Sequence, residues 1–512
     1  MIVHPEDAPG DLTERADVVV IGTGAGGAVV TAELAEAGLT VVALEEGDHY
    51  TGREFTARPL QQMRALYRDR GLTGAFGNTF IGIPVGRAVG GTTIINSGTC
   101  WRAPEEVLRL WEEEFGIPNL AGGGLGAEYE RVERAIHVAP VPDDLLGRGA
   151  ELFRRGAEAL GFRGESIARN ARGCRGTGVC AFGCPHDAKQ SMNVSYVPRA
   201  ERAGARVHVR ARAVRVLIED GRATGVVAER RDTHGRILRD RLRVRADRVV
   251  VCAGALLTPV LLTRSRVVRR WGSVGRNLRI HPATRVLALF DEPVRAWEGV
   301  PQSYHVHEFE SEGIFIQGMF VPPGLQAPNV PGFGFVHKER MAAYERMASF
   351  GALISDASSG HVFAVGRRPL VWYWMRRSDV HRLLRAISIV ARIFFAAGAR
   401  EVYPGVRQRP VLRSVQDAEA LDRLPVRASD IDMMAFHPMG TVRMGRDPAR
   451  CAVAPSGEVH GVPGLYVADA SVFPTSTRVN PQMTIMAFAT RIAAGIVASL
   501  DGRSALRTSA WL

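Results

Sequence analysis

The feature that most constrains this chain is a strand, a glycine-rich turn, a helix and a second strand, following one another near its start. Residues 18–21 are continuously apolar, which is typical of a strand buried on both faces. The predicted helix covers about residues 27–37 and stops at Gly38, a residue that readily takes the left-handed conformation. A second apolar strand covers residues 40–44. This order predicts an α/β fold built on a parallel sheet.

The turn between these elements has the spacing of a dinucleotide-binding loop, Gly22-x-Gly24-x-x-Gly27. One glycine allows the tight turn, one lets the backbone approach a pyrophosphate, and one lets the helix pack on the strand. The diphosphate would face the positive end of the helix dipole. Glu45, at the end of the second strand, is expected to accept hydrogen bonds from the adenosine ribose. The alternative is a glycine-rich turn in another kind of α/β unit.

Length and charge narrow the classes of function. With 512 residues, the chain is long enough for two domains or for one large core with an inserted domain. The net charge is +12, but only Lys189 and Lys338 are lysines, so we attribute the charge to biased composition and predict no nucleic-acid binding. The start has no signal peptide, and no apolar run approaches the roughly 20 residues that span a bilayer. We therefore expect a cytoplasmic protein, with peripheral membrane contact as an additional expectation.

A second glycine pair follows at Gly90 and Gly91, with Thr92 and Asn96 shortly after it. Such a segment brings backbone amides against a flat or anionic ligand, and the Asn side chain can both donate and accept. Further along, residues 206–252 alternate apolar and charged side chains, with turn signals at residues 220–221 and 234–235. That pattern predicts a small antiparallel sheet.

Three of the six cysteines lie within eleven residues, as Cys174-x5-Cys180-x3-Cys184. This spacing is close to that of iron–sulfur ligands. The alternative, which we favour, is a packed loop at the cofactor entrance, with no metal bound.

The region from 291 to 430 has dispersed aromatic residues and prolines and few dinucleotide-binding signals, so we expect a substrate-binding domain there. Its helix over residues 380–398 carries an apolar stripe. We expect this stripe to pack in the protein core. The alternative is that it forms an apolar lip that touches lipid or a long-chain substrate. The acids Glu308, Glu310 and Glu312 are interpreted as a solvated loop.

The last eighty residues hold the candidate catalytic groups. His437 precedes a Pro and a Gly on an expected strand-to-turn edge, and Asp469 ends a short buried strand. Asn480 and Pro481 open a final helix that is expected to run to about residue 498. The free amides at its start suit the electron-rich end of a flavin.

Taken in order, these motifs resemble the glucose-methanol-choline (GMC) family of FAD-dependent oxidoreductases. The resemblance covers most of the chain except about residues 291–430, the part that varies within that family. It implies a Rossmann-like FAD-binding domain, related to that of p-hydroxybenzoate hydroxylase, joined to an α+β substrate-binding domain. The expected parts are FAD-binding segments at 1–105, 186–290 and 431–512, a connecting segment with the cysteine-rich loop at 106–185, and a substrate domain at 291–430.

The resemblance also assigns residues to the cofactor. The expected FAD-binding residues are Gly22, Gly24, Gly27, Glu45, Gly90, Gly91, Thr92, Asn96, Asp469, Ala470, Pro481 and Thr484. Residues 254–259 and 274–282 match a second signature and its usual sequel. Some members attach the flavin to a histidine just before the signature asparagine. Here that position is Ile95, so FAD is expected to be non-covalent.

His437 matches the catalytic histidine of the family, and Asn480 matches its partner. We expect His437 to take the hydroxyl proton of an alcohol, Asn480 to orient the alcohol oxygen, and the flavin to take the hydride. The cysteine-rich loop looks most like that of long-chain fatty alcohol oxidases and dehydrogenases, so a fairly apolar alcohol is expected, with oxygen or another electron acceptor. The alternatives are a cluster-bearing dehydrogenase and a flavin-dependent lyase or photodecarboxylase.

Overall fold

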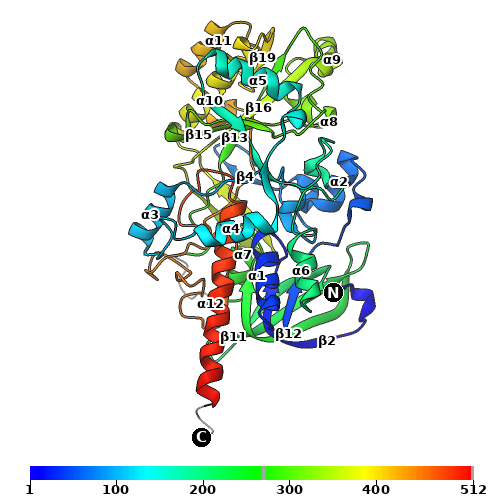
Figure 1. The fold of residues 1–512 in the computed structure, drawn as a ribbon, viewed down its shortest axis with the longest axis vertical. Coiled ribbons are helices and arrows are strands. Elements are labelled where there is room, and N and C mark those ends of the chain that lie inside the picture. The colour runs from blue at the N-terminus through cyan, green and yellow to red at the C-terminus, as the bar shows by residue number, and fades with distance from the viewer. Residues whose placement is uncertain (268–272, 509–512) are drawn as a thin grey trace.

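The computed structural model describes residues 1–267 and 273–508, with side chains up to residue 500. Its strands form two large sheets, one in each half of an elongated molecule (Figure 1). The lower half in that view holds the N-terminal βαβ unit, and the upper half holds most of residues 282–435. The mixed α/β architecture predicted from the sequence is confirmed.

The lower sheet has the strand order β1-β9-β3-β2-β12-β11-β10, with β21 also paired to β12. Its centre is parallel, because β2 lies between β3 and the end of β12. The bounds are β1 Ile2–Val3, β2 Leu12–Ile21, β3 Val41–Leu44, β9 Arg206–His208, β10 Ala211–Glu219, β11 Arg222–Arg231, β12 Ile237–Val251 and β21 Leu465–Val467.

The antiparallel pairing predicted over residues 206–252 is confirmed for β10, β11 and β12, but these strands belong to the larger sheet and β9 pairs in parallel with β3. β10, β11 and β12 are antiparallel, and the turn between β10 and β11 is made by Asp220 and Gly221, both with positive φ. β12 is long enough, however, to continue past the hairpin and pair in parallel with β2. The three strands therefore extend the nucleotide-binding sheet.

Three helices cover this sheet, α1 Ala25–Glu36, α6 Tyr196–Arg202 and α12 Gln482–Thr508. α1 begins two residues before the predicted start because Gly26 and Gly27 belong to its buried first turn. A Cβ on Gly27 would lie 1.9 Å from the carbonyl oxygen of Gly22. The third glycine of the fingerprint therefore serves the packing of helix on strand, as predicted.

The final helix is longer than expected. Its segment Gln482–Leu500 is long and apolar enough to cross a membrane by length and composition, which the sequence analysis did not anticipate. Of that segment, 56% is buried inside the protein, where it packs against α1 and α4 Gly126–Ala135. A helix in the core of a soluble protein can have the same apolar composition. The burial of this segment therefore explains its apolar side chains.

The upper sheet has the order β17-β18-β4-β5-β20-β13-β16-β15-β14-β7, with β19 also paired to β13. The bounds are β4 Gly74–Gly77, β5 Ile81–Gly82, β7 Gly164–Ser166, β13 Pro282–Leu289, β14 Tyr304–Val306, β15 Ile314–Gly318, β16 Met347–Ile354, β17 Gly360–Val365, β18 Arg368–Tyr373, β19 Glu401–Tyr403 and β20 Met433–Ala435.

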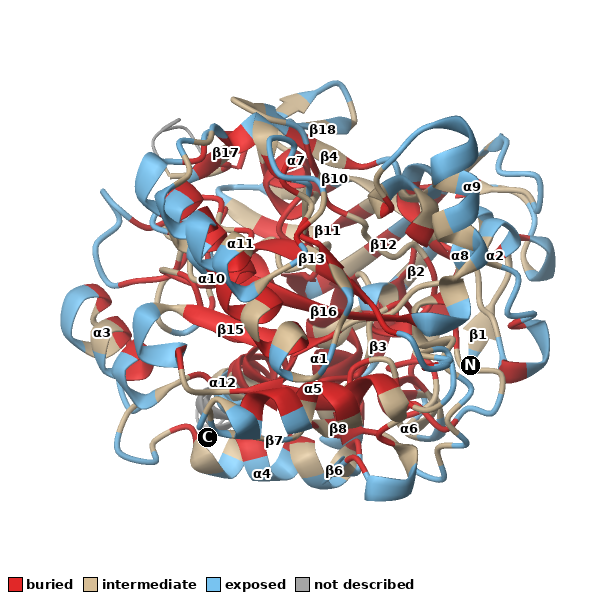
Figure 2. Cartoon of the chain, turned by 90° about the horizontal axis from the view of Figure 1, so that it is seen from above, coloured by how far each residue is buried: buried red, intermediate tan, exposed pale blue. Residues whose placement is uncertain are grey.

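The helices α5 Arg148–Ala159 and α10 Arg377–Ala396 pack on this sheet. Figure 2 shows the strands and the inner side of α10 buried, with the outer side of α10 exposed. The predicted stripe from Leu383 to Phe394 is buried, so the core interpretation holds and the lipid-facing alternative for this helix is wrong.

The remaining elements are short. Residues 104–135 hold the two helices α3 and α4. The bounds are α2 Pro59–Leu66, α3 Glu105–Phe115, α7 Thr258–Arg264, α8 Pro323–Gln326, α9 Gly334–Ala342, α11 Val415–Ala420, β6 Val138–Pro140 and β8 Ala168–Asn170. The domain boundaries expected from the sequence remain a prediction.

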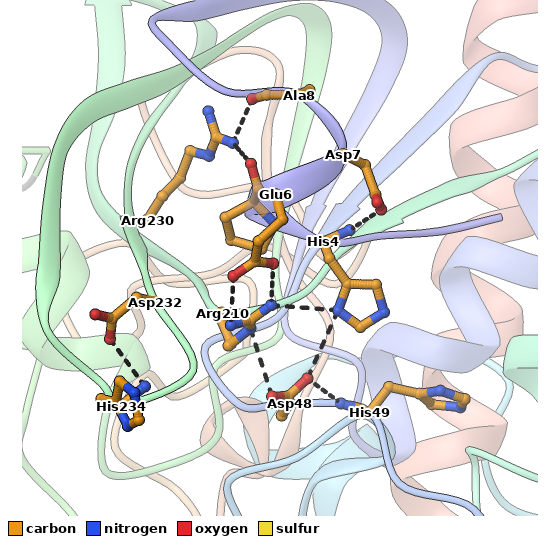
Figure 3. A network of polar contacts seen from close by, with 11 residues as sticks. His4, Glu6, Asp7, Ala8, Asp48, His49, Arg210, Arg230, Asp232 and His234 are labelled. Carbon is orange, nitrogen blue, oxygen red and sulfur yellow. Dashed lines mark hydrogen bonds and ion pairs between the residues drawn. The ribbon is translucent and has the colours of Figure 1, made fainter.

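A polar network fixes the N-terminal segment to the nucleotide-binding sheet (Figure 3). The guanidinium of Arg210 contacts Glu6, His4 and Asp48, and that of Arg230 donates to the carbonyl oxygen of Ala8. These contacts join the chain start to Asp48, which follows β3, to Arg210, which precedes β10, and to Arg230 on β11. They support the edge of the sheet at which the nucleotide loop lies.

Candidate functional site

One cavity of about 490 Å³ collects residues from distant parts of the chain. Its walls include most of the predicted site residues, namely Gly22, Gly24, Glu45, Gly91, Thr92, Asn96, His437, Asp469, Ala470, Asn480 and Pro481. A volume of this size is typical of cofactor and substrate sites. The structure therefore brings the first glycine loop, the second glycine loop and the C-terminal residues around one space.

Three predicted residues do not line this cavity. Gly27 packs α1 on its strand, and Gly90 takes a positive φ of 100° in the turn before the second loop. The hydroxyl of Thr484 lies 3.0 Å from that of Tyr129, on the side of α12 that faces α4. These three residues therefore support the cavity wall through packing and backbone conformation, and they do not line the cavity.

The two glycine loops meet directly. A Cβ on Gly91 would lie 2.8 Å from the Cα of Gly24, and a Cβ on Gly22 would lie 2.4 Å from the carbonyl oxygen of Cys252. The first turn of α1 opens onto the same space, since Gly24, Ala25 and Gly26 all line it. Backbone amides and a helix N-terminus without side chains in the way form a cradle that suits a diphosphate.

Glu45 lines the cavity but is already engaged by the protein. Its carboxylate accepts from the amide and hydroxyl of Thr23, at 3.1 and 2.6 Å, and from the amide of Gly47 at 2.8 Å. Burial raises its pKa. The expectation that this carboxylate serves the ribose alone is therefore incomplete. Thr23, which also accepts from the amide of Gly90 at 3.1 Å, joins the two loops and was missed from the sequence.

Asp469 is engaged in a similar way. Its carboxylate accepts from the amide of Gly254 at 2.8 Å, the hydroxyl of Thr258 at 2.5 Å and the amide of Ser471 at 2.8 Å. Burial raises its pKa. The acid therefore holds the start of α7 against the segment of Ala470, which leaves the backbone of that segment facing the cavity.

A charged group beside Glu45 was also missed. Glu46 lines the cavity and pairs with Arg68 at 2.7 Å and Arg212 at 3.7 Å, both of which line it too. Burial works against ionisation, but the adjacent guanidinium of Arg68 outweighs it and lowers the pKa of Glu46 to about 2. Sequence reasoning could have noticed only that two acids are adjacent.

Asn96 is held by α12 and by a buried lysine. Its side-chain amide donates to Gln482 Oε1 at 2.8 Å, and the ammonium of Lys189 donates to the carbonyl oxygens of Ile94, Asn96 and Cys180 at 2.5 to 2.8 Å. Lys189 is 2% exposed. Burial lowers its pKa to about 8. It therefore ties the second glycine loop to the cysteine-rich loop.

His437 follows β20 and faces a second histidine. Its Nδ1 lies 3.3 Å from Nδ1 of His281, and Nε2 of His281 lies 2.6 Å from the hydroxyl of Ser476. Burial lowers the pKa of His437 to about 3, and burial together with the adjacent ring places that of His281 well below its usual value. Both imidazoles are therefore neutral at pH 7. His281 was not predicted as a site residue.

One of the two polar atoms of the Asn480 side chain has no hydrogen-bond partner among the described residues. Its Nδ2 donates to the hydroxyl of Thr99 at 2.8 Å, while its Oδ1 is buried without a hydrogen-bond partner among the described residues. Buried polar atoms are almost always paired, so an atom of this kind in a cavity wall indicates that a bound molecule completes it.

The three clustered cysteines line a separate cavity of about 20 Å³, together with Arg169 and Lys189. That space holds about one water molecule, and the packed-loop interpretation of the three cysteines stays a prediction. In the described part of the chain, the residues that bring three metal-ligand atoms within 4.8 Å of one another are Glu165, His305 and His307, none of which lines the large cavity.

The three predicted acids lie elsewhere. Glu308 pairs with Arg163 at 2.8 Å and Glu312 with Arg385 at 2.6 Å, and neither these acids nor Glu310 line the cavity.

Comparison with known proteins agrees with this geometry. Two models described as GMC oxidoreductase match residues 63–283 and 367–489. An uncharacterized GMC-type oxidoreductase of Mycobacterium tuberculosis is 42% identical over 98% of this chain and 78% of its own length. A long-chain-alcohol oxidase of Arabidopsis thaliana is 28% identical over 96% of this chain and 68% of its own length. The fold matches the crystal structure of pyridoxine 4-oxidase from Mesorbium loti, with a TM-score of 0.72 and 19% identity over 93% and 98% of the two chains.

Proposed function

The chain belongs to the GMC oxidoreductase family, and we propose that it oxidises a primary or secondary alcohol to an aldehyde or ketone with FAD. GMC oxidoreductases are FAD flavoproteins. One observation carries the proposal. His437 and Asn480, the latter with an unpartnered Oδ1, face the same cavity as the glycine cradle.

The residues of the cavity fit FAD. Gly22 and Gly91 let the loops pack closely, since a Cβ on either would meet backbone, and Gly24 leaves space open in the cavity for a diphosphate. Asn96 and Pro481 line the same cavity as His437, and they would hold the isoalloxazine ring. Ile95 also lines the cavity, at the position where some members of the family attach the flavin, and its side chain cannot form that bond. We therefore propose that FAD is bound without a covalent link.

The chemistry divides between cofactor and protein. Bound FAD supplies the acceptor for the hydride of the alcohol carbon. The hydroxyl proton goes to Nε2 of His437, since Nδ1 of that ring faces His281. A neutral imidazole offers a lone pair for this transfer, and the negative charge that develops on the alcohol oxygen favours the protonated ring. Because the hydroxyl proton is the only one on the alcohol oxygen, Asn480 serves the oxygen as a donor: with its amide turned, Nδ2 donates to the alcohol oxygen and Oδ1 accepts from the hydroxyl of Thr99.

His281 decides which nitrogen of His437 is basic. If Nε2 of His281 donates to the hydroxyl of Ser476, its Nδ1 must accept from Nδ1 of His437. Nε2 of His437 then carries a lone pair toward the cavity. His281 is thus a positioning residue that sets the tautomer of the base.

The apolar walls of the cavity support a fairly apolar substrate. Met319, Phe320, Val321, Leu325 and Met434 line the same cavity as His437. The similarity to a long-chain-alcohol oxidase agrees with this preference.

Anaerobic reduction of the flavin tests the proposal. Primary alcohols of increasing chain length, added to the holoenzyme without oxygen, should bleach the flavin bands, and the rate should rise with apolar surface. Reoxidation by oxygen or by a quinone then identifies the electron acceptor. A flavin that no alcohol reduces would favour the lyase alternative. Release of FAD into the supernatant after acid precipitation tests the non-covalent attachment.

We also propose that the protein is cytoplasmic and contacts membranes through an aromatic face formed by β4, β17 and β18. The outward side chains of these strands are exposed, and Phe363 pairs with Leu370 and Trp372 with Phe76 across the strands. Trp374 stacks beside Trp372, with ring centroids 6.4 Å apart.

The charges around this aromatic face favour an anionic lipid surface as its partner. Arg368, Arg376 and Arg377 flank it, and residues 360–378 contain no Asp or Glu. Aromatic rings and arginines together suit the boundary between headgroups and acyl chains.

A further inference from the structure

The upper sheet carries a polar group in the cavity that the chemistry at His437 does not use. Arg285 on β13 and Gln317 on β15 both line the cavity. Each is aligned with Gly351 on β16, the strand between them. Side chains in the same register project from the same face of a sheet, and these two lie two strand spacings apart, about 10 Å between Cα atoms. No side chain separates them at Gly351, where a Cβ would lie 2.6 Å from the carbonyl oxygen of Thr284 and 3.5 Å from Cε of Met319.

The hydrogen bonds of this group are incomplete. Nη1 of Arg285 donates to Oε1 of Gln326 at 3.0 Å. In the described residues, Nε of Arg285, Nε2 of Gln326 and Oε1 of Gln317 are buried without partners. Gln326 is fully buried and Gln317 is 5% exposed. Since Arg285 has only donors, Gln326 must turn its oxygen toward the arginine, which leaves its NH₂ group without an acceptor.

The charge of Arg285 is also not neutralised by contact. Burial lowers its pKa to about 10, so it stays cationic at pH 7. Asp432 and the hydroxyl of Tyr344 act on it electrostatically. In the described part of the chain, however, no carboxylate oxygen lies within 4.0 Å of its guanidinium. A buried cation with unpaired donors in a cavity wall is costly unless a bound anion completes it.

The distance to the catalytic end is limited by the strand. Arg285 is four residues beyond His281, so their Cα atoms are at most about 14 Å apart. Between them, Ala283 is aligned with Met434 on β20, and Met434 and Phe436 both line the cavity. The cavity therefore has a reactive end, an apolar middle and a cationic end in sequence along β13.

Resting on the proposed alcohol oxidation, we propose that the substrate is an alcohol that carries a carboxylate at its far end, bound by Arg285 with Gln326 and Gln317. A carboxylate accepts from the guanidinium and from the free NH₂ group of Gln326. The amide of Gln317 can present its own NH₂ group to the same anion. The apolar middle binds the carbon chain, so the hydroxyl lies at His437 when the carboxylate lies at Arg285.

Matched substrates test this proposal on the holoenzyme. Primary alkanols and ω-hydroxyalkanoates of equal chain length are compared by the rate and concentration dependence of anaerobic flavin reduction. At the chain length that spans the cavity, the hydroxy acid should half-saturate at a roughly 10- to 100-fold lower concentration than the alkanol. Arg285→Met should abolish this advantage, so that the hydroxy acid half-saturates at no lower concentration than the alkanol. Arg285→Lys should retain part of it, because it keeps the charge without the fork.

Arg400→Met is the matched control, since it removes an exposed arginine that pairs with Asp291 at the surface. It should keep the full advantage of the hydroxy acid. Binding of alkanoates that lack a hydroxyl, measured by calorimetry, gives a readout independent of turnover and should weaken by the same factor in Arg285→Met.

The outcomes separate the two proposals. If alkanols reduce the flavin and hydroxy acids do so no better, the carboxylate site is overturned and alcohol oxidation stands. If no alcohol reduces the flavin but alkanoates bind and Arg285→Met weakens them, the site stands and the proposed function fails. Equal alkanoate binding by wild type, Arg285→Met and Arg285→Lys overturns the site whatever the kinetics show.

Discussion

Nδ1 of His281 lies 3.3 Å from Nδ1 of His437, so the two imidazoles share one proton position. The far side of His281 is held by Ser476, whose hydroxyl lies 3.3 Å from that of the half-buried Ser355. The candidate base is thus the end of a polar chain that leads away from the cavity. A base held in this way has a fixed ring orientation and a defined tautomer.

Replacement of the two histidines should separate their roles. His437→Ala should lower the rate of flavin reduction by roughly 10² to 10⁴, because the proton acceptor is lost. His281→Leu should lower it by about 10² with little change in KM, because the base remains but its ring is misplaced. His281→Gln, which can still hydrogen-bond, should recover part of the rate. A wild-type rate in His281→Leu, measured by anaerobic stopped flow, would remove the positioning role.

The stability of the protein should depend on pH through His437. Its folded pKa of about 3 is below the unfolded value of about 6.5, so the unfolded state binds more protons between these values. Its contribution is therefore present above pH 6.5 and is lost as pH falls, by about 1.4 kcal/mol per pH unit.

Urea unfolding of wild type and His437→Gln from pH 7 to pH 4 measures this contribution as a difference. Asp356, whose pKa burial raises to about 6, and the adjacent His281 are present in both proteins. The wild type should lose its stability advantage as the solution becomes acidic. Parallel curves would contradict the buried, neutral state of His437.

Replacement of Lys189 should lower the free energy of unfolding far more than replacement of an ordinary surface lysine. Lys189→Met would leave three carbonyl oxygens without their donor, at a cost of about 3 kcal/mol or more in the free energy of unfolding. The other lysine, Lys338, is exposed on α9, and Lys338→Met should change stability by less than about 0.5 kcal/mol. Similar melting temperatures for both variants would refute the anchoring role.

Substitution of two glycines of the first loop should have different effects, one on stability and the other on FAD binding. A Cβ on Gly27 meets the carbonyl oxygen of Gly22 at 1.9 Å, so Gly27→Ala should destabilise the fold by more than about 3 kcal/mol. A Cβ on Gly24 meets nothing closer than 3.8 Å but enters the cavity, so Gly24→Ala should fold and retain less FAD. Gly126→Ala, in open space at the start of α4, is the control. The ratio of flavin to protein absorbance after gel filtration separates these cases.

The aromatic face should bind anionic vesicles. Trp372→Glu combined with Phe76→Glu should reduce co-sedimentation with phosphatidylserine vesicles by roughly tenfold or more, because apolar area is lost and like charges repel. Phe335→Glu changes a more exposed ring on α9 and should have little effect. Equal sedimentation of all three proteins, or a gel-filtration mass that falls only in the double variant, would assign the face to another partner or to a second copy of the chain.

Much of the nucleotide-binding half could be predicted because its signals are local. The strand at 18–21, the glycines after it and the turn at residues 220–221 each follow from a few consecutive residues. Predictions failed where the length of an element decided the outcome. β12 runs beyond its hairpin into the parallel sheet, and α12 continues well past residue 498.

By itself, the sequence determined the βαβ unit, the glycine cradle and the two residues, His437 and Asn480, that end at one cavity. Only the tertiary structure decided that His281 backs the base, that Thr23 and Lys189 join the loops, and that Arg285 and Gln317 face one another across Gly351. The physical reason is the sequence separation over which each kind of interaction acts. Backbone preferences and periodicity act over a few residues, whereas these side chains meet only through the register of strands and loops that are far apart in the chain.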